Sequence, residues 1–175
     1  GSKICVGFSF DYHVEAERLI DRIRHIDSMA YRELLSTREK VEPLFKFIEE
    51  SPWEISLCHN DLYEPNLLVS GENLNIIDWE FAGDSDIGFD ICKLFSVEKI
   101  AYEEIDKYVE YYFRRQTTKE EKMHLIACAA IIYYYWFVWA VYVSKTGEEA
   151  SEYMMGWYDK MNYFCDEFLR HMEEE

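Results

Sequence analysis

Residues 125–144 constrain the fold more than any other stretch, because these twenty consecutive positions carry no charged side chain. A helix of that length could cross a lipid bilayer. However, Tyr133, Tyr134 and Tyr135 occupy its middle, whereas membrane helices keep tyrosine near the two interfaces. The stretch therefore predicts a helix buried on all sides inside a protein core, with other helices packed around it.

The composition fits one domain without a targeting segment. Of the 175 residues, 49% are hydrophobic and 17% aromatic, which excludes a disordered chain and suffices for one core. The five cysteines are widely spaced and form no Cys-x-x-Cys pair, so neither a disulfide framework nor a zinc site is indicated. No secretory signal is recognisable, and together these features predict a cytoplasmic protein. Gly1-Ser2 resembles a remnant of tag cleavage, which leaves residues 3–175 as a single domain.

The chain is strongly acidic. It has 18 Lys and Arg against 35 Asp and Glu, a formal net charge of −17. Such a surface repels nucleic acid and anionic lipid, so we expect neither a nucleic acid nor a membrane as partner. The charge favours a cationic ligand, although a negative exterior also serves solubility alone.

The first third of the chain has a helical pattern. Apolar residues recur at three- and four-residue spacing over residues 14–50, which predicts two or more helices. Asp27-Ser28 and Ser36-Thr37 are the expected breaks, and Pro43 suits a first helical turn.

One β region follows, and the remainder is helical. Residues 55–58 form an apolar run, and residues 66–70 and 74–79 read as strand, turn and strand. The helices expected after this hairpin cover residues 86–97, 101–116, 118–145 and 148–173.

Chemistry is concentrated in residues 58–68, Cys-His-Asn-Asp-Leu-Tyr-Glu-Pro-Asn-Leu-Leu, and in Asp78 beyond the hairpin. Phosphoryl transfer needs a carboxylate that accepts the proton of the acceptor hydroxyl, and an Asn and a second carboxylate that hold Mg²⁺. Asp61 and Asn66 have the Asp-x-x-x-x-Asn spacing of the protein-kinase catalytic loop, and Asp78 occurs where kinases keep a metal-binding Asp. Asp and Asn in loops often serve only as turn residues, but the order and context here favour phosphotransfer. His59 is better interpreted as a structural loop residue than as a base.

Three motifs resemble the choline/ethanolamine kinase family, which belongs to a wider group with the aminoglycoside phosphotransferases. They are His-Asn-Asp-Leu at 59–62 with Asn66, Ile-Asp-Trp-Glu-Phe-Ala-Gly at 77–83, and Gly-Phe-Asp-Ile at 88–91. The resemblance runs from about Phe8 to the C-terminus. It implies a mainly α (α+β) fold, the helical C-terminal lobe of a kinase-like protein with a small β-hairpin beside the catalytic loop.

The resemblance also implies roles for individual residues. Asp61 would be the catalytic base, and Asn66 and Asp78 would bind Mg²⁺, with ATP as the phosphoryl donor. Glu80 and Asp90 would support the site as acidic neighbours, although both also suit a purely structural role.

The acceptor pocket distinguishes choline kinases from their aminoglycoside relatives. A quaternary ammonium group cannot donate hydrogen bonds, so aromatic faces and a nearby carboxylate must hold it. Trp136 and Trp139 match the Trp-x-x-Trp of the family, and their spacing places both rings on one helix face. The resemblance also suggests Tyr102 and Tyr158 as pocket aromatics, with core packing as the alternative role.

Two features depart from the family pattern. A Glu expected a few residues after Asp90 appears as Val97, with Glu98 one place later, so the acceptor could differ from choline or ethanolamine. In addition, the ten residues before Asp11 hold no glycine-rich loop and no kinase lysine motif. The sequence therefore predicts a C-terminal lobe without its N-terminal lobe, with little turnover alone.

Two other functions stay open. An aminoglycoside or other small-molecule phosphotransferase lobe would need carboxylates in its pocket more than an indole pair. A non-catalytic remnant that binds a cationic metabolite or another subunit suits the missing lobe, whereas the presence of Asp61, Asn66 and Asp78 argues against it. The face left open by that lobe also suggests a homodimer.

Overall fold

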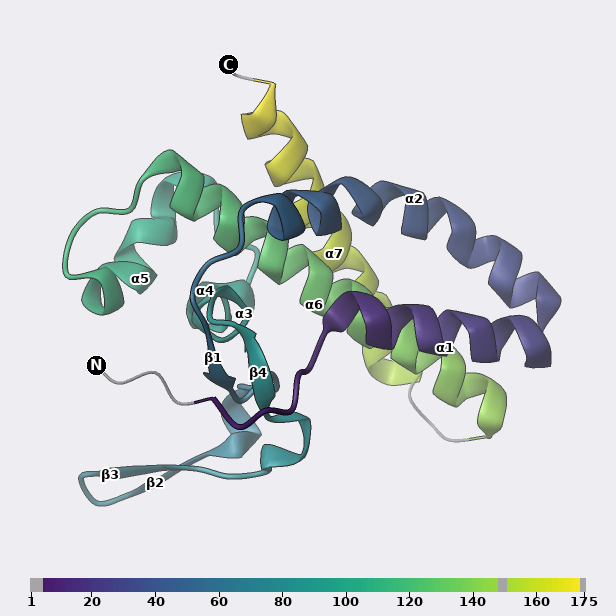
Figure 1. Ribbon diagram of the computed structural model, residues 1–175, viewed down its shortest axis with the longest axis horizontal. Helices are drawn as coiled ribbons and strands as arrows, with labels where there is room; N and C mark the ends of the chain where they lie inside the picture. Colours follow the sequence, from purple (N-terminus) through teal and green to yellow (C-terminus); the bar gives the residue numbers. More distant parts are fainter. Residues whose placement is uncertain (1–4, 148–150, 174–175) are drawn as a thin grey trace. The chain divides into compact units, whose positions relative to one another are not determined.

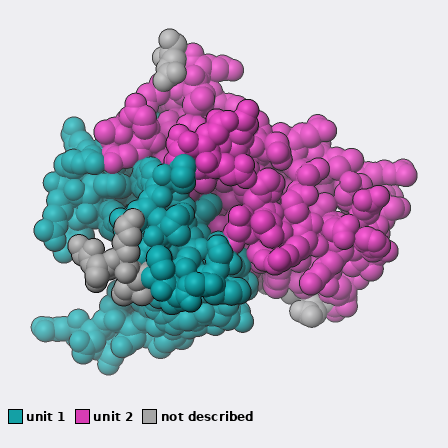
Figure 2. All heavy atoms as spheres, in the orientation of Figure 1, with its two compact units in different colours: residues 1–10, 52–117 teal, residues 11–51, 118–175 magenta. Residues whose placement is uncertain are grey.

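The computed structural model describes residues 5–147 and 151–173, and the chain divides into two compact units (Figures 1 and 2). Unit 1 comprises residues 1–10 and 52–117, and unit 2 comprises residues 11–51 and 118–175. Gly1-Ser2, interpreted above as a tag remnant, lies outside the described residues.

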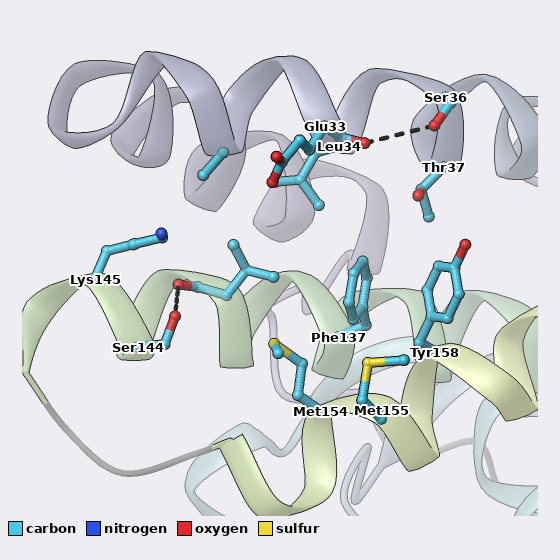
Figure 3. Close-up of a pocket in the computed structure, with 12 residues that line it drawn as sticks. Glu33, Leu34, Ser36, Thr37, Phe137, Ser144, Lys145, Met154, Met155 and Tyr158 are labelled. Atoms are coloured by element: carbon cyan, nitrogen blue, oxygen red, sulfur yellow. Dashed lines mark hydrogen bonds between the residues drawn. The ribbon is translucent and has the colours of Figure 1, made fainter.

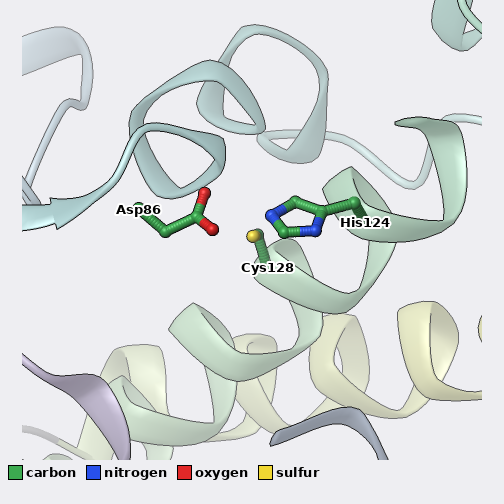
Figure 4. A group of neighbouring side chains, drawn as sticks. All are labelled: Asp86, His124 and Cys128. Carbon is green, nitrogen blue, oxygen red and sulfur yellow. The ribbon is translucent and has the colours of Figure 1, made fainter. Parts of the chain in front are cut away.

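Unit 2 is helical and is organised around helix α6 (Lys119–Thr146), which packs against α1 (Tyr12–Ile26), α2 (Ser28–Glu50) and α7 (Ser151–Met172). Every residue from Met123 to Tyr135 is buried. These include His124 and Cys128, which lie one turn apart on α6 (Figure 4). Among the described residues, α6 is the one helix long and apolar enough to cross a bilayer, and 72% of its most apolar window is buried. It is the buried core helix that the sequence predicts.

The ends of α6 are set by local sequence. Thr118 and Glu121 form a reciprocal capping box, in which the Thr118 hydroxyl accepts the Glu121 N–H and the Glu121 carboxylate accepts the Thr118 N–H. At the other end Gly147 adopts φ 95°, a left-handed conformation that glycine tolerates best.

Asp27 separates α1 from α2, as the sequence predicts. Its carboxylate accepts the N–H groups of Met29 and Ala30, both at 3.0 Å, and forms an ion pair with Lys145 at 2.9 Å. The hydrogen bond from Ala30 is the main reason that the pKa of Asp27 is lowered, and Lys145 adds to it.

The other break that we expected in this region is wrong. Helix α2 continues through Ser36-Thr37, and Pro43 lies inside it rather than in a first turn. A proline there removes one helical hydrogen bond. Burial of Val41, Leu44, Phe45 and Ile48 on the same helix offsets that loss.

Unit 1 holds two small antiparallel sheets and short helices. Strand β1 (Ile55–Cys58) pairs with β4 (Gly83–Asp86), and β2 (Leu67–Ser70) pairs with β3 (Asn73–Ile76) in the hairpin visible in Figure 1. The helices of this unit are α3 (Gly88–Ile91), α4 (Lys93–Ser96) and α5 (Ile105–Phe113).

Strand β4 was not predicted, because Gly-Asp-Ser-Asp has low β-propensity. It forms because it has partners on both sides: β1 along one edge, and Ser9 in a parallel bridge on the other. The Asp84 carboxylate also accepts the N–H groups of Val6 and Gly7, each at 2.8 Å. The second hairpin strand ends at Ile76, earlier than the expected residue 79.

The contact between β4 and the N-terminal segment yields a prediction. A Cβ atom at Gly83 would meet the backbone N of Phe10 and the backbone O of Phe8 at 3.0 Å. Backbone atoms cannot swing aside, so Gly83→Ala should lower the free energy of unfolding by about 1–3 kcal/mol.

Urea denaturation would measure this change. Gly156→Ala is the matched control, since nothing lies within 4 Å of a Cβ atom there. Because Gly156 lies in the second turn of α7, that substitution should instead stabilise the protein by about 0.5–1 kcal/mol. Equal stability of Gly83→Ala and wild type would contradict the close approach.

Candidate functional site

Asp61 and Asn66 are brought together by the loop that follows β1. Asn60 turns the chain with a left-handed φ of 64°, and a short turn, η1 (Glu64–Asn66), returns it toward Asp61. The amide Nδ2 of Asn66 donates to the backbone oxygen of Asp61 at 3.0 Å and to its Oδ2 at 3.2 Å. The amide group of Asn66 is thereby oriented, with its Oδ1 directed away from these two acceptors.

Asp90, from α3, holds the start of this loop. Its Oδ2 accepts the backbone N–H of His59 at 2.7 Å, and its Oδ1 accepts that of Asn60 at 2.9 Å. Burial raises the pKa of Asp90, and these two hydrogen bonds oppose the shift. One carboxylate thus accepts two successive N–H groups and fixes the backbone just before the left-handed Asn60.

His59 links the loop to the end of the hairpin. Its Nδ1 accepts the backbone N–H of Asp61 at 3.2 Å, which requires the ring hydrogen on Nε2, and Nε2 then donates to the Ile77 carbonyl at 2.8 Å. The imidazole also packs on Trp79, with 4.7 Å between ring centroids. Both ring nitrogens are therefore engaged in structure rather than poised for proton transfer.

Asp78 follows β3, and its neighbour Ile77 is hydrogen-bonded to the loop that carries Asn66. The Ile77 N–H donates to the Asn66 carbonyl at 3.0 Å, which joins the hairpin end to the loop. Asp78 itself has φ 62° and ψ 62°, a left-handed conformation. Carboxylate and amide oxygens are the donors that Mg²⁺ prefers, so Asn66 and Asp78 fit a hard cation chemically. Glu80 lies exposed in the turn η2 (Trp79–Phe81).

The half-buried carboxyl of Asp61 holds its proton more tightly than an ordinary Asp does, because its pKa is raised. Burial raises its pKa to about 6, and the negative charge of Asp78 adds to the rise. Lys93, His59 and the hydrogen bond from Asn66 act in the opposite direction. A carboxylate with a pKa near 6 is still ionised at neutral pH and is a better proton acceptor than an ordinary Asp.

In unit 2, Trp136 and Trp139 lie edge to face, with 5.7 Å between ring centroids. A third indole, which the sequence did not predict for this site, is Trp157 of α7. Its ring centroid is 5.9 Å from that of Trp136 and 6.3 Å from that of Trp139. Tyr153 stacks on Trp157 at 5.8 Å. The spacing of Tyr153 and Trp157, four residues apart on α7, was the signal that could have identified this face.

The two predicted tyrosines belong to different units. The ring of Tyr158 contacts Phe137, with 5.0 Å between centroids, and both line a cavity that neither Trp136 nor Trp139 lines. Tyr102 begins the turn η3 (Tyr102–Glu104) in unit 1, whereas the tryptophan cluster belongs to unit 2. Val97 and Glu98, at the departure from the family pattern, are both exposed.

Two solved structures share this fold. The choline/ethanolamine kinase family protein of Mesorhizobium loti matches with a TM-score of 0.78 and 19% identity over 99% of this chain and 61% of its own. The choline kinase LicA of Streptococcus pneumoniae matches with a TM-score of 0.74 and 21% identity over 93% of this chain and 57% of its own. The architecture is thus a kinase-like fold, mainly α with small β elements.

Sequence comparison extends the match. Protein LicA of Haemophilus influenzae is 30% identical over 134 residues, which cover 72% of this chain and 50% of LicA. A thiamine kinase of Escherichia coli is 38% identical over 53 residues, 30% of this chain and 19% of its own. The chain thus spans at most about half the length of these relatives. The family model for choline/ethanolamine kinases matches residues 12–126, and the chain belongs to this family.

Proposed function

We propose that this chain carries the catalytic-loop and acceptor-binding residues of an ATP- and Mg²⁺-dependent kinase for choline or a related amino alcohol such as ethanolamine. The observation that carries the proposal is Asp61, a half-buried carboxylate with a pKa raised to about 6 and an Asn66 amide at 3.2 Å. Membership of the choline/ethanolamine kinase family supports a small-molecule phosphotransferase as the parent activity.

Asp61 would act as the general base. As the acceptor oxygen forms its bond to the γ-phosphorus of ATP and the bond to ADP breaks, the hydroxyl proton passes to the Asp61 carboxylate. The hydrogen bond from Asn66 orients that carboxylate, and Asp90 holds the loop through the N–H groups of His59 and Asn60. Asp90 and His59 are therefore positioning residues in this scheme.

Asn66 and Asp78 would hold Mg²⁺ through their side-chain oxygens. When bound, the metal supplies positive charge that neutralises the nucleotide phosphates. The protein's own contribution is the left-handed turn at Asp78 and the Ile77–Asn66 hydrogen bond, which joins the two backbone segments that carry these side chains.

The tryptophan cluster Trp136, Trp139 and Trp157 would bind the ammonium group of the acceptor through cation–π attraction. Three indoles favour an acceptor with a permanent, apolar cation over an aminoglycoside, whose many ammonium and hydroxyl groups need hydrogen-bond acceptors. The names of the relatives fit this choice, because choline and thiamine both combine a quaternary nitrogen with a primary hydroxyl.

We also propose a cellular location, the absence of two classes of partner, and self-association. We expect a cytoplasmic protein without nucleic-acid or membrane partners. The hairpin β2–β3 exposes Leu68, Val69 and Leu74 by 49%, 75% and 59%, and such an apolar surface supports self-association or cover by further polypeptide. Sedimentation of the chain would distinguish a dimer from a monomer.

Choline binding is the first test, because it needs no nucleotide. Titration with choline should change the tryptophan fluorescence saturably, and Trp136→Ala should weaken the affinity about tenfold, since it removes one cation–π wall. Trp53→Phe is the control, because Trp53 lies in unit 1 against Phe113. An aminoglycoside that binds while choline does not would redirect the proposal to another acceptor.

A second test uses the pH dependence of stability. Because the pKa of Asp61 is about 6 in the folded state and about 4 in an unfolded chain, folding favours its protonated form. The ionised carboxylate therefore destabilises the protein, by an amount that grows from about pH 4 to pH 6 and stays constant above pH 6. Asp61→Asn should raise the unfolding free energy at pH 7.5, and the gain should vanish below pH 4.

Urea denaturation at several pH values would show this trend. Glu72→Gln, at an exposed position of the hairpin turn, should leave the stability unchanged throughout. Any choline-dependent release of ADP should also be lost in Asp61→Asn. A variant no more stable than wild type at pH 7.5 would show that Asp61 is not held in a destabilising environment.

A further inference from the structure

Unit 2 contains a cavity of about 380 Å³ (Figure 3), and neither Trp136 nor Trp139 lines it. Residues of three helices, α2, α6 and α7, form its walls. Its volume lies at the lower end of the range of small-molecule sites, about 300–1,000 Å³. The lining residues are Ala30, Glu33, Leu34, Ser36, Thr37, Phe137, Val141, Ser144, Lys145, Met154, Met155 and Tyr158.

The walls of this cavity suit an apolar or aromatic body. Phe137 and Tyr158 meet at a ring separation of 5.0 Å and present aromatic surface. Met154 and Met155 supply flexible thioethers, which adapt to ligands of different shape. Leu34, from α2, is buried and closes the opposite side.

Two charged side chains line the cavity, Glu33 and Lys145, and among the described residues the charge of Glu33 is the one left uncompensated. Lys145 is already paired with Asp27, at 2.9 Å, so its charge is compensated within the protein. Glu33 lies on the α2 side of the cavity (Figure 3), and within residues 5–147 and 151–173 its carboxylate has no ion-pair partner. A carboxylate and two aromatic rings that line the same cavity are the combination that attracts an organic cation.

We infer that this cavity binds an organic cation with an aromatic or alkyl body. The ammonium group pairs with Glu33, and the apolar body packs between Phe137, Tyr158, Met154 and Met155. The site does not depend on the proposed kinase function, because it uses none of the residues assigned to the catalytic loop or to the tryptophan cluster.

Methionine methyl NMR provides a local readout. With ¹³C-methyl methionine, titration with phenethylammonium should shift the signals of Met154 and Met155 saturably, whereas Met123 and Met161, both buried, should not move. Single Met→Leu variants assign the two cavity signals. The neutral analogue 2-phenylethanol should bind more weakly, because it offers no charge to Glu33.

Substitutions identify the site. Glu33→Gln should weaken phenethylammonium binding about three- to fivefold, the effect expected for a solvent-exposed ion pair. Glu39→Gln is the matched control, since Glu39 is exposed on the same helix but does not line the cavity. Trp136→Ala should leave the Met154 and Met155 shifts intact, so failure of the choline proposal and failure of this one are distinguishable.

Three outcomes would overturn the inference. The first is an absence of shifts at Met154 and Met155, and the second is equal binding of the ammonium and the alcohol. The third is a loss of binding in Trp136→Ala with none in Glu33→Gln, which would place the ligand at the tryptophan cluster.

Discussion

Burial of α6 is the constraint on which unit 2 depends. A helix with thirteen consecutive buried residues, Met123 to Tyr135, has no hydrophilic stripe to present to water and must be covered on all sides. Helices α1, α2 and α7 provide that cover. Because α6 continues beyond its fully buried part to Thr146, its last turns carry partly covered side chains as well as buried ones. There Trp136 and Trp139 contact each other, and Phe137 and Val141 line the cavity.

Aspartate as an acceptor of backbone N–H groups is the recurring device in both units. Among the residues that the structure describes, one carboxylate accepts two backbone N–H groups in five places. Two are helix starts, one is the N-terminal segment beside β4, one joins Trp53 to Gly88, and one is the loop that follows β1. The carboxylates are those of Asp11, Asp27, Asp84, Asp86 and Asp90. Part of the large negative charge is therefore structural rather than a solvated exterior or a signal for cationic ligands. Charge-assisted bonds of this kind are stronger than bonds between neutral groups.

The proposed catalytic loop shows how these hydrogen bonds affect a candidate catalytic group. Asp90 satisfies the N–H groups of His59 and Asn60, and His59 satisfies that of Asp61. The Asp61 carboxylate is thus not needed to stabilise its own loop, and within the described part of the chain its hydrogen bond comes from the Asn66 amide. Burial raises the pKa of this carboxyl although Lys93, His59 and Asn66 oppose the rise. The raised pKa suits a general base, and the ionised carboxylate lowers the stability of the fold. The same carboxylate, that of Asp61, is therefore unfavourable for stability and suited to the proposed proton transfer.

The sequence by itself determined the local features of this protein. The uncharged run specified a buried helix, Asp27 and Thr118 specified helix starts, and the order of Asp61, Asn66 and Asp78 indicated the kinase-like loop, because each depends on neighbours close in the chain. Only the tertiary structure decided what distant segments contribute. Strand β4 forms because it pairs with β1 and Ser9. Pro43 is tolerated inside α2 because other residues of that helix are buried. Trp157 contacts Trp136 because α7 packs on α6. These outcomes depend on long-range contacts that outweigh local propensity.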